Sequence, residues 1–119
     1  MKKKITVMDD EEDSLTLMGL ILSRNGYDVK TDLTGAVLDS INDENTDLLI
    51  LDINLGYKNG KDICRELKLH PNTRDIPVIL TSAIKELPEI SEACGAKDYL
   101  GKPFISTDLL GKVKTSLFP

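Results

Sequence analysis

The sequence lacks an apolar stretch long enough to cross a membrane, and it lacks the pattern of an export signal. Nowhere in its 119 residues does it approach the roughly 18 consecutive apolar residues of a membrane-spanning helix. The lysines at positions 2–4 are followed by the short run Ile5–Met8 and then by acidic residues at 9–13. This leaves no room for the apolar region of about 7–15 residues in a signal peptide. We therefore expect a cytoplasmic protein without membrane insertion.

Cysteine and clustered basic residues are also scarce. Cys64 and Cys94 lie far apart and lack metal-binding spacing, so we interpret them as reduced thiols that are buried or semi-buried. The formal net charge of −5 argues against direct nucleic-acid binding, which would need clustered lysine and arginine to neutralise phosphates. The hydrophobic content of 40% and charged content of 29% are those of an ordinary globular domain.

Strand-like and helix-like segments alternate along the chain without repeats or linkers, so we expect residues 1–119 to form one domain. The predicted strands cover residues 4–8, 27–31, 47–52, 77–82 and 97–100. A helix is predicted after each strand: the first capped by Asp13 or Ser14, the second capped by Thr34 and carrying Val37, Leu38 and Ile41, the third ending before His70, the fourth at about 85–94 and the fifth at about 106–117.

This alternation predicts an α/β fold of the flavodoxin-like (βα)5 type. It is a doubly wound parallel sheet with strand order 2-1-3-4-5 between two helical layers, a three-layer sandwich. The unbroken apolar run at 48–51 supports it, because a strand covered on both faces needs no polar alternation. In this order strands one and three are neighbours, so Asp9, Asp10 and Asp52 should meet at the edge of the sheet.

Polar residues follow the predicted strands at the points where they end. Asp9 and Asp10 follow the first strand, Asp52 ends the third, Ser82 closes the fourth and Lys102 follows the fifth. Two ionised carboxylates about 5 Å apart repel by roughly 3 kcal/mol at an effective dielectric constant near 20. Such a cluster must hold a proton or bind a cation. Because Mg²⁺ prefers oxygen ligands and often binds with phosphates, it suits this cluster.

The same residues allow covalent phosphoryl chemistry. Asp52 is central and could act as a nucleophile that forms an acyl phosphate. Lys102 would balance the phosphoryl charge, and the Ser82 hydroxyl could donate to a phosphoryl oxygen. Taken singly, an aspartate or serine after a strand is more often a turn or cap residue. It is the joint placement after four separate strands that favours a functional site.

Four segments of the chain share a characteristic order and spacing. They are residues 5–11, residues 49–52 with Gly60 eight positions later, residues 77–83 and residues 95–104. Together they resemble the receiver domain of two-component response regulators, the CheY-like superfamily. The resemblance covers essentially the whole chain.

The resemblance implies a function in phosphorelay signal transduction. A sensor histidine kinase or histidine phosphotransfer protein would donate a phosphoryl group to Asp52. Asp9 and Asp10 would position Mg²⁺, with Asp52 and the backbone carbonyl of Asn54 as further ligands. Such a domain is not an enzyme in the usual sense, since it catalyses only its own phosphorylation and dephosphorylation.

The resemblance also implies a conformational switch. Ser82 and Lys102 would contact the phosphoryl group, Tyr99 would turn inward when Ser82 moves, and the bond before Pro103 would be cis. The face formed by the last two predicted helices and the fifth strand would then change its affinity for a downstream target protein, and it could also support a homodimer. The chain departs from the family at Gly56, where proline is common, and we expect a looser loop there.

Other classes fit less well. A haloacid-dehalogenase-type phosphatase carries a second aspartate two residues after its nucleophile, where this chain has Asn54. A flavodoxin-like FMN-binding protein needs a hydroxyl- and glycine-rich loop after the first strand, and the acids found there would repel phosphate. A receiver-shaped interaction module without phosphoryl turnover stays open as an alternative, and phosphorylation in vitro would discriminate.

Overall fold

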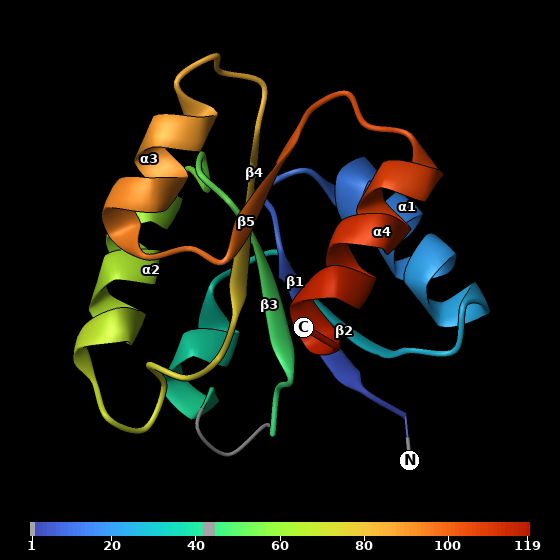
Figure 1. Ribbon diagram of the computed structural model, residues 1–119, viewed down its shortest axis with the longest axis horizontal. Coiled ribbons are helices and arrows are strands. Elements are labelled where there is room, and N and C mark those ends of the chain that lie inside the picture. Colours follow the sequence, from blue (N-terminus) through green and yellow to red (C-terminus); the bar gives the residue numbers. More distant parts are fainter. Residues whose placement is uncertain (1, 42–44) are drawn as a thin grey trace.

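The computed structural model describes residues 2–41 and 45–119, in which strands and helices alternate (Figure 1). The strands of this part of the chain are β1 Lys4–Met8, β2 Asp28–Asp32, β3 Leu48–Asp52, β4 Val78–Ser82 and β5 Asp98–Gly101. Its helices are α1 Glu12–Arg24, the 3₁₀ helix η1 Ala36–Ser40, α2 Gly60–Leu69, α3 Leu87–Cys94 and α4 Ser106–Leu117. Over the same residues, every helix is too short or too polar to cross a bilayer.

The strands form a parallel sheet in the order β2-β1-β3-β4-β5. The doubly wound order predicted from the sequence is therefore confirmed. The register aligns the carboxyl ends of neighbouring strands: Met8 pairs with Leu51, and Ser82 pairs with Gly101. Residues that follow these strands are thus brought to the same edge of the sheet.

Helices cover both faces of the sheet, giving three layers (Figure 1). On one face α1 and α4 pack over a cluster of buried apolar residues that includes Met18 and Leu109. On the other face η1, α2 and α3 pack over a second cluster that includes Val37 and Ile63. Each residue of β3 and β4 is buried, which explains why β3 reads as an unbroken apolar run.

Helix α1 begins two or three residues earlier than predicted. It starts at Glu12 with Glu11 at the N-cap position and without a side-chain cap, so the predicted cap at Asp13 or Ser14 is wrong. The physical reason is the turn out of β1, where the carboxylate of Asp9 accepts the Glu11 N–H at 3.0 Å. Glu12 and Asp13 instead lie in the first turn, where negative side chains interact favourably with the helix dipole.

The second predicted helix is a short 3₁₀ helix, η1, and not an α-helix. Gly35 precedes it with φ +87°, a left-handed conformation that cannot belong to an α-helix. The Asp32 carboxylate fixes this turn by accepting the N–H groups of Thr34 at 3.1 Å and Val37 at 3.3 Å. The apolar spacing was still informative, because Val37 and Ile41 are buried.

Candidate functional site

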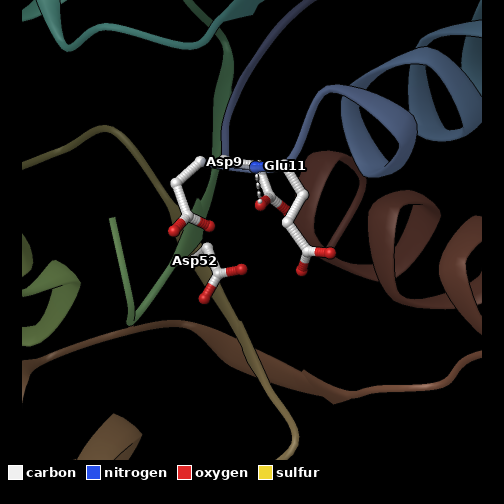
Figure 2. Close-up of side chains that lie close together, drawn as sticks. Asp9, Glu11 and Asp52 are labelled. Atoms are coloured by element: carbon white, nitrogen blue, oxygen red, sulfur yellow. Dashed lines mark hydrogen bonds between the residues drawn. The ribbon is translucent and has the colours of Figure 1, made fainter. Parts of the chain in front are cut away.

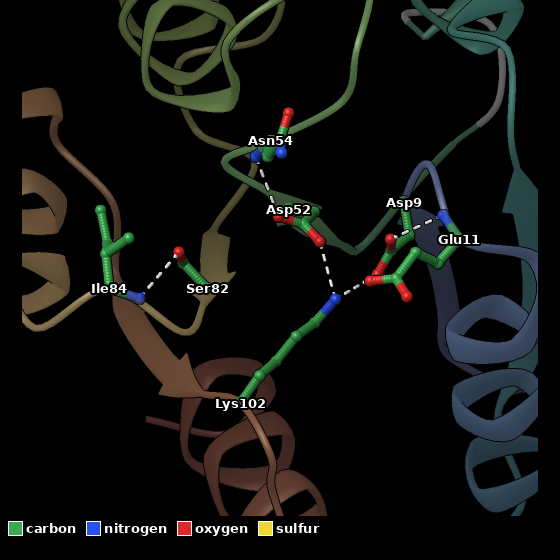
Figure 3. Close-up of polar contacts among 7 residues, drawn as sticks. All are labelled: Asp9, Glu11, Asp52, Asn54, Ser82, Ile84 and Lys102. Atoms are coloured by element: carbon green, nitrogen blue, oxygen red, sulfur yellow. Dashed lines mark hydrogen bonds and ion pairs between the residues drawn. The ribbon is translucent and has the colours of Figure 1, made fainter.

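The residues predicted to form the site come together at the carboxyl edge of the sheet (Figure 3). Asp9 directly follows β1, Asp52 ends β3, Ser82 ends β4 and Lys102 directly follows β5. The parallel register described above is the reason for this convergence, since each strand delivers its last side chains to the same side of the molecule.

A lysine bridges the two buried carboxylates of the site. The Lys102 Nζ atom lies 2.7 Å from Asp9 Oδ2 and 2.7 Å from Asp52 Oδ2. The side chains of Asp9, Asp52 and Lys102 are 0%, 7% and 15% exposed. Buried charges are tolerated when they are paired and hydrogen-bonded. Lys102 is therefore the cation that pairs with both carboxylates at this edge of the sheet.

Backbone N–H groups hold the other oxygen of each carboxylate. The N–H of Asn54 donates to Asp52 Oδ1 at 2.9 Å, and the N–H of Glu11 donates to Asp9 Oδ1 at 3.0 Å. Both donors lie two residues after the carboxylate that they bind, so the turns leaving β1 and β3 orient the acids locally. Each carboxylate is thus fixed by one backbone donor and by Lys102 (Figure 3).

Burial acts in opposite directions on the pKa values of Asp52 and Lys102. Burial raises the pKa of Asp52, and the hydrogen bonds from Lys102 and Asn54 N–H offset this only in part. Burial alone would lower the pKa of Lys102, but its bonds to Asp52 and Asp9 outweigh that effect and raise the pKa. The lysine therefore stays protonated, while the Asp52 carboxylate is costly to keep ionised. A further cation beside it would be favourable.

Four carboxylates form a group that could hold a metal ion. Oxygen atoms of Asp9, Asp10, Glu11 and Asp52 lie within 4.8 Å of one another, and Figure 2 shows Asp9, Glu11 and Asp52 gathered in this way. Asp9 and Asp52 are buried whereas Asp10 and Glu11 are exposed, so the group has a buried floor and an open mouth. Carboxylate oxygens alone fit a hard divalent cation such as Mg²⁺.

Glu11 was not assigned a ligand role from the sequence. The acidic run at 9–13 was the signal, but a run does not reveal which of its members turn toward β3. That depends on the turn between β1 and α1. The exposed Asn54 has its N–H on Asp52, and its side chain points away from the carboxylates in Figure 3. Its carbonyl as a metal ligand stays a prediction.

Ser82 is buried and joins the site from β4. Its hydroxyl oxygen accepts the N–H of Ile84 at 3.2 Å (Figure 3). Its carbonyl oxygen accepts the N–H of Lys102 at 2.8 Å. The residue therefore connects the ends of β4 and β5, while its hydroxyl is turned toward the loop that leads into α3.

Tyr99 lies on β5 with its ring toward the surface, 37% exposed. The Lys112 Nζ atom is 4.7 Å from the centroid of this ring and 3.1 Å from Asp98 Oδ1. This cation–π contact from α4 favours the outward position. The Lys102–Pro103 peptide bond is cis, at the point where the chain leaves the site for α4.

Comparison with known proteins adds independent information. A family model described as the response regulator receiver domain matches residues 5–114. A putative response regulator from Chloroflexus aurantiacus J-10-fl is 28% identical over 100% of both chains, with a TM-score of 0.93. A CheY-like receiver domain protein from Methanospirillum hungatei JF-1 is 30% identical over 98% of this chain and 94% of its own, with a TM-score of 0.86. The response regulator DrrB of Thermotoga maritima, an OmpR/PhoB homolog, is 36% identical over 98% of this chain and 53% of its own, with a TM-score of 0.83.

Proposed function

Because the chain belongs to the receiver domain family of two-component response regulators, we propose that Asp52 accepts a phosphoryl group and that residues 1–119 act as one signalling domain. The observation that carries this proposal is the Lys102 bridge between the buried Asp9 and Asp52 carboxylates, beside an open acidic mouth. That arrangement holds the Asp52 carboxylate in place beside exposed carboxylates that could bind a cation.

In the proposed reaction, a phosphohistidine of a sensor kinase or phosphotransfer protein is the donor. A carboxylate oxygen of Asp52 attacks the phosphorus atom; a P–O bond forms while the P–N bond of the donor breaks, and the imidazole leaves with the electron pair. The N–H of Asn54 and the ammonium of Lys102 orient the attacking carboxylate. After the transfer, the Lys102 ammonium would donate hydrogen bonds to the negatively charged phosphoryl oxygens.

The metal-binding residues in this proposal are Asp9, Asp10, Asp52 and the carbonyl of Asn54, and the proximity of Glu11 adds a candidate. Bound Mg²⁺ supplies positive charge that offsets the phosphoryl charge. The fit rests on the donor set, which is made of carboxylate oxygens within reach of one another. Asp9 also has a structural role, because its Oδ1 atom accepts the Glu11 N–H in the turn that leads into α1.

The proposed switch follows from the contacts of Ser82 and Tyr99. A phosphoryl group on Asp52 would attract the Ser82 hydroxyl as a donor and draw it away from the N–H of Ile84. The vacated space would admit the Tyr99 ring, which would give up its contact with Lys112. The surface of α3, β5 and α4 would then change its affinity for a downstream target protein or a second copy of the chain, in the cytoplasm.

Intact mass after incubation with acetyl phosphate and Mg²⁺ tests this function. We expect the wild type to gain one phosphoryl group only when Mg²⁺ is present, and Asp52→Asn to gain none. Asp62→Asn is a matched control because this exposed aspartate lies on α2, and it should be labelled like the wild type. No gain from acetyl phosphate or from a phosphorylated histidine donor would contradict the proposal and favour the alternative of an interaction module without phosphoryl turnover.

A further inference from the structure

The loop between β3 and α2 connects Asp52 to the helix that follows, and an aromatic side chain, Tyr57, lies near its tip. The ring of Tyr57 leaves this loop and packs against Gly35, which precedes η1. Neither residue belongs to the acidic, hydroxyl or lysine groups that the chemistry described above uses. The contact joins the segments that follow β2 and β3, the two strands that flank β1 in the sheet.

The surface that receives Tyr57 is a turn held by hydrogen bonds from the side chains of Asp32 and Thr34. One oxygen of the Asp32 carboxylate accepts the N–H of Thr34 at 3.1 Å and the other accepts the N–H of Val37 at 3.3 Å. The Thr34 hydroxyl in turn accepts the N–H of Ala36 at 3.3 Å. These bonds fold residues 32–37 into a hydrogen-bonded turn, which we call the platform.

Gly35 is the point of contact on this platform. A Cβ atom at this position would lie 2.6 Å from Cε2 and Cζ of Tyr57 and 2.7 Å from its hydroxyl oxygen. Real Cβ atoms do not approach other atoms so closely, so the ring occupies the space that any side chain at position 35 would need. The absence of a side chain at Gly35 is therefore what lets the end of the Tyr57 ring lie against the backbone.

The tip of the loop is itself folded tightly. The N–H of Tyr57 donates to the carbonyl of Leu55 at 2.9 Å around Gly56, whose φ is +78°, which is a γ-turn. Proline is fixed near −65° and cannot adopt this conformation. Gly56 was expected to loosen the loop, and in the structure it forms a hydrogen-bonded γ-turn. A Cβ atom on Gly56 would lie 3.9 Å from Asp10 Oδ2.

The base of the loop is anchored separately. The N–H of Gly60 donates to the carbonyl of Ile53 at 2.6 Å, and Asn54 pairs with Asn59 across the loop. Asn54 therefore lies between an anchored base and a tip that Tyr57 holds. Its N–H is the backbone donor to Asp52, so movement of the tip would be transmitted to the peptide beside the phosphoacceptor.

The surroundings of Tyr57 agree with a docked ring. Partial burial raises the pKa of its phenol, and the charges of Asp32 and Asp10 raise it further. The hydroxyl therefore stays protonated and lies in the field of two carboxylates, Asp32 at the end of β2 and Asp10 in the segment after β1. Although 47% of the residue remains exposed, its position is set by the packing against Gly35.

From this geometry we infer that Tyr57 is a positioning residue: its ring clamps the β3–α2 loop to the platform at Gly35 and so holds the Asn54 peptide in place for binding of a divalent cation. The inference rests on the proposed function, because it concerns the metal site of the same cluster. It predicts that loss of the ring weakens Mg²⁺ binding while leaving the Asp9, Asp10 and Asp52 carboxylates intact.

Calorimetric titration of the unphosphorylated protein with MgCl₂ tests the inference directly. We expect Tyr57→Ala to lower the Mg²⁺ affinity by about tenfold, the lower end of the effect of residues that orient metal ligands. Tyr57→Phe keeps the ring and should bind like the wild type. Phe118→Ala removes a comparably exposed aromatic residue that contacts Lys3 at the opposite edge of the sheet, and it should also leave the affinity unchanged.

Amide hydrogen exchange measured by NMR without Mg²⁺ is a second readout. Tyr57→Ala should speed exchange of the Asn54 and Tyr57 amides, whereas amides of β4 should keep their rates. Equal Mg²⁺ affinity and equal exchange in wild type and Tyr57→Ala would overturn the inference and leave the proposed function standing. Absence of Mg²⁺ binding by the wild type would overturn both. Should Tyr57→Ala fail to fold, Tyr57→Leu replaces it, with the same expected results.

Discussion

At the scale of single residues, the stability of the site depends on how the charges of Asp9 and Asp52 are compensated. Lys102→Met would keep much of the side-chain volume and remove the ammonium that bonds to both. Leaving buried carboxylates without their partner costs about 3 kcal/mol, the low end for buried pairs because the cluster opens to solvent. We expect this loss in the free energy of unfolding at neutral pH, measured by urea denaturation.

The pH dependence of that loss has a definite sign. Burial raises the pKa of Asp52, and removal of the Lys102 hydrogen bond would raise it further above the unfolded value. The destabilising effect of the Asp52 charge is therefore present at neutral pH and fades as a proton binds on acidification. In the wild type the pKa of Lys102 is raised, so its stabilising effect is present below its ordinary pKa and is lost as the pH rises through the folded value. The difference in the free energy of unfolding between Lys102→Met and the wild type should therefore become smaller toward pH 4. A difference independent of pH would instead indicate lost packing.

The sequence was a good guide to some site residues and a poor guide to others. Asp9, Asp52 and Lys102 could be placed together because each follows a strand, and a parallel sheet aligns strand ends. Glu11 and Tyr57 could not, because their positions depend on the turns after β1 and β3 and not on strand order. The bridging role of Lys102 was also missed, since sequence position does not show which way a long side chain reaches.

At the scale of elements, the start of α2 depends on a close approach that only glycine allows. A Cβ on Gly60 would collide with the backbone carbonyl of Asp52. Because neither backbone can move without disturbing β3, we expect Gly60→Ala to lower the free energy of unfolding by about 2–3 kcal/mol, in the range for overpacked positions. It should also slow phosphorylation of Asp52, since the shift falls on that residue.

Gly111→Ala is a matched control for Gly60→Ala. Gly111 lies inside α4, and nothing lies within 4 Å of the position of its Cβ. Replacing glycine by alanine in a helix interior stabilises by about 0.5–1 kcal/mol. The two substitutions should therefore have opposite signs in urea denaturation. Similar effects at both sites would mean that the contact at Asp52 does not determine the stability of α2.

The order of the elements followed from patterning, but their ends did not. Apolar spacing located every helix of the described chain, yet η1 is a 3₁₀ helix that begins only after a turn made by Asp32 and Gly35. Likewise α1 begins at Glu12 because Asp9 makes the preceding turn. In both places a carboxylate at a strand end binds backbone N–H groups two or more residues later. Such local competition is not visible in hydrophobic periodicity.

At the scale of the whole molecule, the fold buries apolar strands at the centre of the sheet and gathers acidic side chains at its carboxyl edge. The burial of β3 and β4 on both faces fixes the centre of the sheet, and for β3 it was predicted from the unbroken apolar run. The carboxyl edge collects four neighbouring acids in a chain whose net charge is already −5. Folding therefore works against electrostatic repulsion at this edge, and a cation that binds there should stabilise the entire domain.

Thermal unfolding with and without Mg²⁺ tests this coupling between the site and the fold. A ligand that binds the native state alone stabilises it by RT ln(1 + [L]/Kd), about 2.7 kcal/mol at a concentration of 100 Kd. We expect MgCl₂ to raise the Tm by several degrees more than NaCl of equal ionic strength, because NaCl only screens the net charge. Asp10→Asn should lose most of the Mg²⁺-specific part and keep the effect of NaCl, since Asp10 is exposed and its substitution leaves the buried floor intact. Equal shifts with the two salts in the wild type would show that the acidic edge responds to ionic strength and not to a bound cation.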